Sequence, residues 1–538
     1  MKYSYLLSTL LLAVSFQTTA QEFAFAPNAG GGEFLERVGG YKLSVAQKVF
    51  DALLNARGDF RMQKPTLVMN QKEGDVACFV PDKVQIILDE KAYDVCATFG
   101  KDSLNALAAL LAHELIHYYE KHDWSRHFAR ENEHLETTRQ LEILEEGLKQ
   151  EAQADYLGGF MAFSVGFNTY GIMPKLLEKI YRTYDRPDDL PGYPSLSDRL
   201  KMVDGAMAQL QALQIVFETG NFLTILGNYA DAAVYHRHIL QTYQSREIYN
   251  NAGVNAALAA LVLVEPTEMP FVLPLELDPR SRLLGLKNND QEKKAKRAAL
   301  LKLALEQFDR ALLLDENYSI AYLNKACVLA LNGDWEDAEY AIRKGKRKSQ
   351  DAAISSDFMT LEGILAALQK DSSMAVVHWE KALKQGNPWA KMNLEILQKT
   401  PRAPIAFPAP AKGLEEIEQF PLADFLASPN PDREVKVDEK VFCGTRQYLN
   451  SRLFIHYANQ GKNYALIQET QSNYTGKTIR GIGLKDDQEK VQAAYGKAPR
   501  TLSLPNGSVW VYPESNLFFR FSTQSKVESW SVYRKSTI

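Results

Sequence analysis

The chain has 538 residues, of which 46% are hydrophobic and 24% are charged, and its formal net charge is -4. This composition excludes an intrinsically disordered chain, and it offers no clustered excess of Lys and Arg for binding nucleic acid. One basic run, residues 343–348, closes a predicted helix, where cations interact favourably with the last carbonyl groups. At roughly 100 to 200 residues per domain, we expect about three or four domains.

Residues 1–20 are predicted to be a cleaved signal peptide. Lys2 precedes an apolar run over residues 5–16, and residues 18–20 offer small side chains before Gln21. No cysteine follows the apolar run, so a lipid anchor is not expected. No later segment reaches the ~20 apolar residues that span a bilayer. We therefore expect an exported protein, periplasmic or secreted, with no transmembrane segment after signal cleavage.

The next segment mixes helix and strand patterns. Residues 41–56 favour a helix, and residues 66–70 and 84–88 favour strands bounded by turn residues. Cys78 and Cys96 bracket a short stretch here, and an oxidising compartment permits them to pair. We predict a disulfide between them; the alternative is two buried thiols.

A metal-binding pattern follows at residues 113–117, His-Glu-Leu-Ile-His, inside an apolar stretch that favours a helix. Residues four apart lie one above the other on a helix, so His113 and His117 can bind one metal ion. Glu114 lies about 100° around the helix from His113, which leaves it available as a general base. The alternative is an amphipathic helix whose two histidines are partly buried and hydrogen-bonded.

A carboxylate from a second helix completes the pattern. A catalytic zinc ion takes three protein ligands and one water, and Glu151 is the candidate third ligand. Asp155, one helical turn further on, is placed to accept the outward ring N–H of a ligand histidine and to fix its tautomer.

At these residues the chain resembles a known family of peptidases. HELIHYYEKH (113–122) and EAQADYLGGFMAF (151–163) are similar to the HtpX and BepA kind of metallopeptidase, the family that also contains the CAAX-prenyl endopeptidases. The resemblance implies a mainly helical gluzincin-type domain with a small sheet over residues 21–205. It also implies one zinc ion per chain, held by His113, His117 and Glu151, with Glu114 as base and Asp155 behind the ligands.

Three further elements follow from the resemblance. Members of this family have a His-Pro pair followed by Arg, and here Tyr193-Pro194 precedes Arg199, so a tyrosine replaces the histidine. Tyr193 is a candidate hydrogen-bond donor to the developing oxyanion; the alternative is a loop tyrosine packed by prolines. Arg199 is either a hydrogen-bond donor in the cleft or a structural partner of an acidic residue such as Asp155. His122 matches a frequent family histidine, and we interpret it as a surface residue near a helix end. Residues 83–88 are the candidate edge strand that receives extended substrate.

From residue 206 to about 400 the chain repeats. Tyr322, Ala326, Gly333, Trp335 and Ala338 follow the spacing of a tetratricopeptide repeat, and related patterns precede and follow them. Residues 265–282 form a Pro-rich insertion. We predict paired helices that form a curved surface for a protein partner; a purely structural spacer is the alternative.

The end of the chain is predicted to form a small α+β domain over residues 440–538, after a Pro-rich linker over residues 401–439. Asp486 and Asp487 favour the start of a short helix, and strands are expected at 509–512, 517–521 and 527–533. The overall fold class is therefore α+β and multidomain.

Two functions are consistent with these patterns. The first is an exported zinc metalloendopeptidase that cleaves extended or misfolded proteins in envelope quality control, with the repeats binding protein. The second is a chaperone-like or assembly factor whose metal site is structural or mostly gated. Glu114 favours the first, because a binding protein has no need of a carboxylate beside the metal's water.

Overall fold

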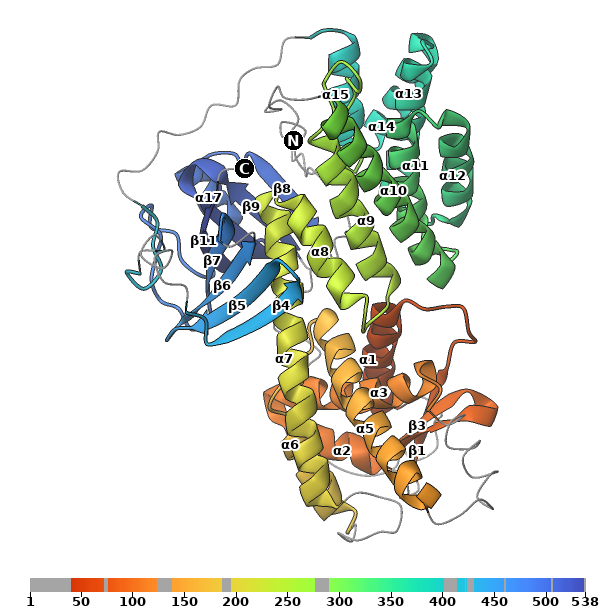
Figure 1. Ribbon diagram of the computed structural model, residues 1–538, viewed down its shortest axis with the longest axis vertical. Helices are drawn as coiled ribbons and strands as arrows, with labels where there is room; N and C mark the ends of the chain where they lie inside the picture. The colour runs from red at the N-terminus through yellow and green to blue at the C-terminus, as the bar shows by residue number, and fades with distance from the viewer. Residues whose placement is uncertain are drawn as a thin grey trace. The chain divides into compact units, whose positions relative to one another are not determined.

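Figure 1 shows the computed structural model of the chain. The structure describes residues 40–71, 76–122, 138–185, 195–275, 290–400, 414–420, 422, 430–458, 461–504 and 507–536. The chain forms two compact units, one up to Gln214 and the other from Ile215, and the boundary falls inside helix α7 (Leu196–Leu226). The expected signal peptide lies outside the described residues.

The first unit is a helical layer with a small sheet. Its elements are α1 (Tyr41–Arg57), β1 (Thr66–Asn70), β2 (Ala77–Val80), β3 (Gln85–Asp89), α2 (Glu90–Ala97), α3 (Ser103–Tyr119), α5 (Thr138–Ser164), α6 (Met173–Thr183) and the start of α7. The expected helix at 41–56 and strand at 66–70 are confirmed.

The sheet of this unit has the order β1-β3-β2. β3 pairs in parallel with β1, where Thr66 faces Gln85, and antiparallel with β2, where Ala77 faces Leu88. The prediction that residues 83–88 form an edge strand was therefore wrong, because β3 is bonded on both sides. β2 lies at one edge of the sheet and packs beside α3.

Helix α3 is a core helix. All of its residues except Asn105 and Glu114 are buried, as expected for a helix that is apolar on nearly every side. It packs closely on α5. A Cβ atom added at Gly158 of α5 would lie only 3.0 Å from backbone atoms of Ala112 and His113, so the two backbones touch at this point.

The predicted disulfide was wrong, since no disulfide joins Cys78 and Cys96 in the structure. Cys78 is half-buried on β2, whereas Cys96 lies on α2 and is fully buried. Burial raises the pKa of the Cys96 thiol to about 12. A thiol that stays protonated in an apolar core is a poor nucleophile for disulfide formation.

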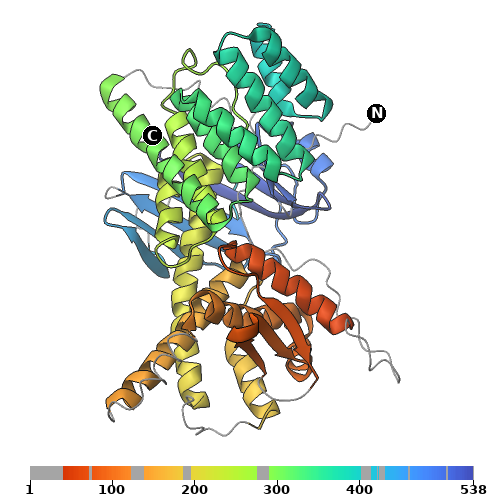
Figure 2. The same cartoon turned by 90° about the vertical axis from the view of Figure 1, so that its right-hand side faces the viewer.

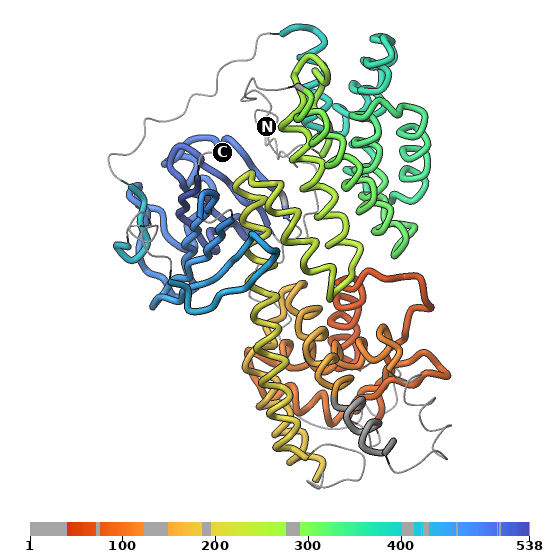
Figure 3. Tube along the Cα trace, viewed as in Figure 1, coloured from red at the N-terminus to blue at the C-terminus, as the bar shows by residue number. Residues whose placement is uncertain are grey.

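The second unit contains an array of paired helices. They are α8 (Tyr229–Ile239), α9 (Arg246–Leu261), α10 (Asp290–Leu314), α11 (Ser319–Asn332), α12 (Trp335–Lys348), α13 (Ala352–Leu368), α14 (Ser372–Lys384) and α15 (Pro388–Leu397). α9 packs on α10, α11 on α12 and α13 on α14. Figures 2 and 3 show these helices stacked in sequence order. The predicted helical repeat region is present.

Small residues allow the paired helices to approach. A Cβ atom at Gly345 would clash with the rings of Phe358 and one at Gly363 with the indole of Trp379. Trp379 itself is fully buried and donates from Nε1 to the carbonyl oxygen of Thr360, at 2.9 Å. Among the described residues, no helix is both long and apolar enough to cross a membrane.

The C-terminal part is an antiparallel sheet of order β4-β5-β6-β7-β11-β10-β9-β8. The strands are β4 (Arg433–Asp438), β5 (Val441–Gln447), β6 (Ser451–Ala458), β7 (Asn463–Thr470), β8 (Arg500–Leu504), β9 (Gly507–Tyr512), β10 (Leu517–Ser522) and β11 (Val527–Lys535), with α17 (Gln488–Tyr495) between β7 and β8. The short helix and the three expected strands are confirmed. The predicted linker was too long, because β4 lies inside it and Ile417 belongs to the core of this sheet.

The sheet packs on the first helices of the array. Phe222 of α7 contacts the rings of Phe454 and Phe518, on two different strands. The Tyr235 hydroxyl of α8 lies 2.9 Å from Nδ1 of His456 and donates to the carbonyl oxygen of Phe442 at 3.1 Å. The C-terminal α+β domain therefore shares a buried interface with α7 and α8 (Figure 1).

Candidate metal centre

Two histidines on α3 face each other one helical turn apart. His113 is 8% exposed and His117 is 5% exposed, and their Nε2 atoms are 3.0 Å apart. Spacing by four residues produces this arrangement, because such residues share one face of a helix. Both rings therefore direct a ligand nitrogen to the same point.

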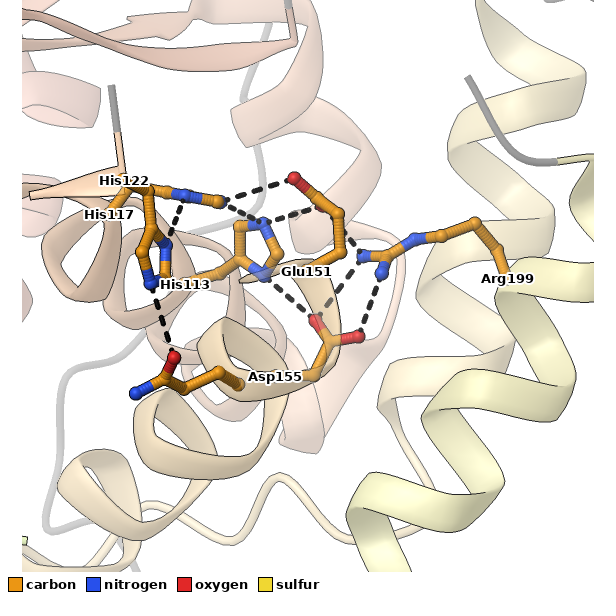
Figure 4. A network of polar contacts seen from close by, with 7 residues as sticks. His113, His117, His122, Glu151, Asp155 and Arg199 are labelled. Carbon is orange, nitrogen blue, oxygen red and sulfur yellow. Dashed lines mark hydrogen bonds and ion pairs between the residues drawn. The ribbon is translucent and has the colours of Figure 1, made fainter. Parts of the chain in front are cut away.

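Helix α5 brings a carboxylate to that point. Oε2 of Glu151 is 3.3 Å from Nε2 of His113, and its Oε1 is 3.4 Å from Nε2 of His117. Figure 4 shows the three side chains converging from the two helices. Within the described part of the chain, these residues are the one group of His, Cys, Asp and Glu that is arranged to hold a metal ion.

The donor set fits zinc. Zinc–nitrogen and zinc–oxygen bonds are about 2.0 to 2.2 Å long, so ligand atoms at tetrahedral angles lie about 3.3 Å from one another. The separations of 3.0, 3.3 and 3.4 Å agree with this value. Two imidazoles and one carboxylate are also a ligand set typical of catalytic zinc, which leaves one coordination position open.

A buried acidic residue supports the first histidine. Oδ1 of Asp155 is 2.7 Å from Nδ1 of His113, and Asp155 is only 2% exposed. Such a carboxylate accepts the outward N–H, which fixes the ring and leaves Nε2 free of a proton for metal binding. The sequence-based assignment of Asp155 behind the ligands agrees with this position.

Arg199 of α7 holds both carboxylates of the site. Its guanidinium lies 3.1 Å from Oδ2 of Asp155 and 3.4 Å from Oε2 of Glu151, and the residue is 6% exposed. Of the two roles considered from the sequence, the structure places Arg199 as an ionic partner of Asp155 and Glu151. Tyr193 lies outside the described residues.

The second histidine has a supporting residue that sequence reasoning missed. His122 is 4% exposed, and its Nδ1 lies 2.9 Å from Nδ1 of His117, while its Nε2 is 3.4 Å from Oε1 of Gln153. The prediction of a surface histidine was wrong. Lys121 adopts a left-handed conformation with φ of 56°, and this turn beyond the end of α3 directs His122 back onto His117.

The charges around the site favour a cation. Burial alone would lower the pKa of His113, but the hydrogen bonds and charges of Asp155 and Glu151 raise it to about 10. Burial would raise the pKa of Glu151, but the two histidines and Arg199 hold it well below its usual value. The Glu151 carboxylate therefore remains ionised and stabilises positive charge beside the two histidines.

Glu114 occupies the side of α3 that is not closed by the core. It is half-buried, whereas His113, Leu115, Ile116 and His117 around it are all buried. Glu114 is thus the residue of this run that the core covers least, and its role as general base stays a prediction.

Comparisons with known proteins add no family. No family model and no curated protein matches the chain. A monomeric mutant of IFIT1 with Gppp-AAAA aligns with a TM-score of 0.30 and 15% identity, covering 57% of this chain and 57% of that chain. The human IFIT1 dimer with m7Gppp-AAAA aligns with a TM-score of 0.29 and 15% identity, at the same coverage. The chain thus spans less than two thirds of these proteins, and so weak a likeness carries no functional argument.

Proposed function

We propose that the protein is an exported, zinc-dependent endopeptidase that cleaves extended or misfolded protein segments in envelope quality control. One observation carries the proposal: the Nε2 atoms of His113 and His117 lie 3.0 Å apart, and each lies 3.3 or 3.4 Å from a carboxylate oxygen of Glu151. They come from two helices whose backbones touch, so the triangle is fixed by the core of the unit. The apolar amino terminus supports export.

The residues of the site divide the work of hydrolysis. His113, His117 and Glu151 would hold one zinc ion, which when bound polarises a peptide carbonyl and acidifies a water molecule. Glu114 accepts the proton of the attacking water and delivers it to the leaving amine. Asp155 and His122 hold the two imidazoles in the orientation that keeps each Nε2 directed at the ion.

The sheet beside the site suits an extended substrate. β2 is an edge strand, and its Phe79 packs on the ring of Tyr118, the residue after His117, with centroids 5.2 Å apart. A peptide that adds to β2 as a further strand is recognised through its main chain, so varied sequences are accepted. This is the recognition expected of an enzyme that removes misfolded proteins.

Substitution of Glu114 by Gln tests the proposal. The expected result is one zinc ion per chain in both wild type and E114Q, measured by elemental analysis, and cleavage of an unfolded protein by wild type alone. The amide keeps the shape of the side chain but cannot accept the proton. E151Q is the matched control, because it removes a ligand charge and is expected to lower zinc content as well as cleavage.

Two outcomes contradict the proposal in different ways. Equal cleavage by wild type and E114Q means that Glu114 is not the base. Wild-type protein that binds no zinc means that the triangle is a hydrogen-bonded cluster, and the endopeptidase function is then rejected.

A further inference from the structure

A short segment after α9 lies against the far end of the helical array. Residues 269–275 have no helix or strand, yet Met269, Phe271, Val272, Leu273 and Leu275 are each at most 7% exposed. The residues immediately before them, 265–268, are exposed. Burial of the apolar side chains, in a segment without regular structure, indicates that the segment is held by contacts with other helices.

The main chain of the segment is held by one asparagine. The Val272 N–H donates to Oδ1 of Asn393 at 2.7 Å, and Nδ2 of Asn393 donates to the Val272 carbonyl oxygen at 2.9 Å. Asn393 lies on α15 and is fully buried. The carboxamide thus satisfies both polar groups of one residue, as a neighbouring strand does, and these contacts are independent of the side chain at position 272.

An aromatic pair adds an anchor. The Phe271 ring lies 5.3 Å from the indole of Trp379 on α14, at an interplanar angle of 51°. Three residues before Phe271, Glu268 is paired with Arg297 of α10. Five residues extend at most about 17 Å, yet residues 268–272 reach α10, α14 and α15. The segment therefore connects α10, near the start of the array, with α14 and α15 at its end.

We propose that Trp379 and Asn393 form a binding site for an extended apolar segment of another polypeptide, and that residues 269–275 occupy this site in the chain alone. The contacts define what the partner must supply: a free N–H and carbonyl at one residue, with a large apolar side chain just before it. A folded helix cannot supply them, because its main-chain groups are already paired. The partner is therefore an unfolded or extended segment, which binds by displacing residues 269–275.

This inference does not depend on the metal centre. It concerns residues of the second unit alone, so E114Q is expected to bind the partner as wild type does. Failure of the peptide experiments below therefore leaves the proposed zinc chemistry standing, and the reverse also holds.

A labelled peptide with the sequence of residues 267–275 tests the site in the full-length protein by fluorescence anisotropy. A variant with F271A and L273A loosens the internal segment, so it is expected to bind the peptide at least tenfold more tightly than wild type. Adding N393A to that variant is expected to reverse the gain. A peptide methylated on the nitrogen matching Val272 lacks the donor to Asn393 and is expected to bind at least tenfold more weakly, whereas methylation at the residue matching Glu268 is the control.

A second measurement, hydrogen–deuterium exchange, uses the wild-type protein and therefore does not depend on the folding of a variant. Saturating peptide is expected to accelerate deuterium uptake in residues 269–275 of the wild-type chain at least threefold, because the segment is displaced. Unchanged uptake shows that the segment is a fixed part of the array and overturns the proposal. The proposal is also overturned if wild type and a folded F271A/L273A variant bind the peptide with equal affinity, or if adding N393A leaves the peptide affinity of that variant unchanged.

Discussion

Replacement of Gly158 by alanine tests whether the contact between α3 and α5 sets the geometry of the metal centre. Gly158 lies on the helix that carries Glu151, and a Cβ atom there would be 3.0 Å from the Ala112 carbonyl carbon and from the His113 nitrogen. Both atoms are backbone, so no side-chain rotation relieves the contact. The two helices must move apart.

The size of the effect follows from these distances. Ordinary contacts of a Cβ atom begin at 3.4 Å, so the helices separate by about 0.4 Å or more. Overpacking of this kind costs about 1 to 3 kcal/mol, and alanine recovers about 0.5 to 1 kcal/mol of helix propensity. The loss in unfolding free energy is therefore modest, about 0 to 2.5 kcal/mol. Zinc sites tolerate distance errors of only about 0.2 Å, so we expect zinc affinity to fall at least tenfold.

Gly159 is the matched control for this experiment. A Cβ atom at Gly159 would meet Cδ2 of Leu210, the end of a flexible side chain, at 2.6 Å. Leu210 can change rotamer without moving α3, so G159A is expected to retain zinc affinity within about threefold. Affinity is measured by competition with a chromophoric chelator, and stability by urea unfolding without metal. Wild-type zinc affinity in G158A, or an equal loss in both variants, refutes the link between helix contact and ligand geometry.

Two other predictions concern His122, which the sequence analysis placed at the surface, and His236. H122F removes the hydrogen-bond partner of His117, so it is expected to lower zinc affinity about 10- to 100-fold, measured by the same chelator competition. The control is H378F, at a half-buried histidine of α14. Unchanged zinc affinity in H122F contradicts the supporting role. Burial lowers the pKa of His236 to about 4, so as the pH falls the unfolded chain binds a proton at His236 before the folded chain does. The contribution of neutral His236 to the free energy of unfolding is therefore fully present above pH 6.5 and is lost as the pH falls toward 4. The loss is about 3 kcal/mol. Between pH 4.5 and 7.5, the free energy of unfolding in urea is expected to change less with pH in H236L than in wild type. An equal pH dependence in the two proteins excludes the effect.

The candidate site could be predicted from the sequence where local geometry decides it. The i, i+4 spacing of His113 and His117 needs only a helix, and the structure has that helix. Glu151 and Asp155 were selected from the number of ligands that zinc takes and from a resemblance, because nothing in spacing alone shows that α5 lies against α3. His122 was missed because its position depends on the left-handed turn at Lys121, which its residue type does not favour.

The fold shows the same division between local and non-local information. β1 and β3 have apolar sequences bounded by turn residues, and both were expected, but the strand order is set by pairing that no single segment encodes. β4 was overlooked although Val435 and Val437 alternate with charged residues, because the preceding prolines suggested a linker that continued. The docking of the sheet on α7 depends on Phe222, whose neighbours on β6 and β10 are more than 200 residues away.

The structure also explains how the donor triangle forms from the protein alone. Two unprotonated Nε2 atoms at 3.0 Å would repel each other, since each carries a lone pair. The hydrogen bonds and charges of Asp155 and Glu151 raise the pKa of His113, which favours a proton on this imidazole in the protein without a metal ion. Arg199 offsets part of the negative charge of Asp155 and Glu151. A divalent ion that displaces this proton would add one net positive charge beside the two carboxylates, with the side chains already in position, so little reorganisation opposes its binding.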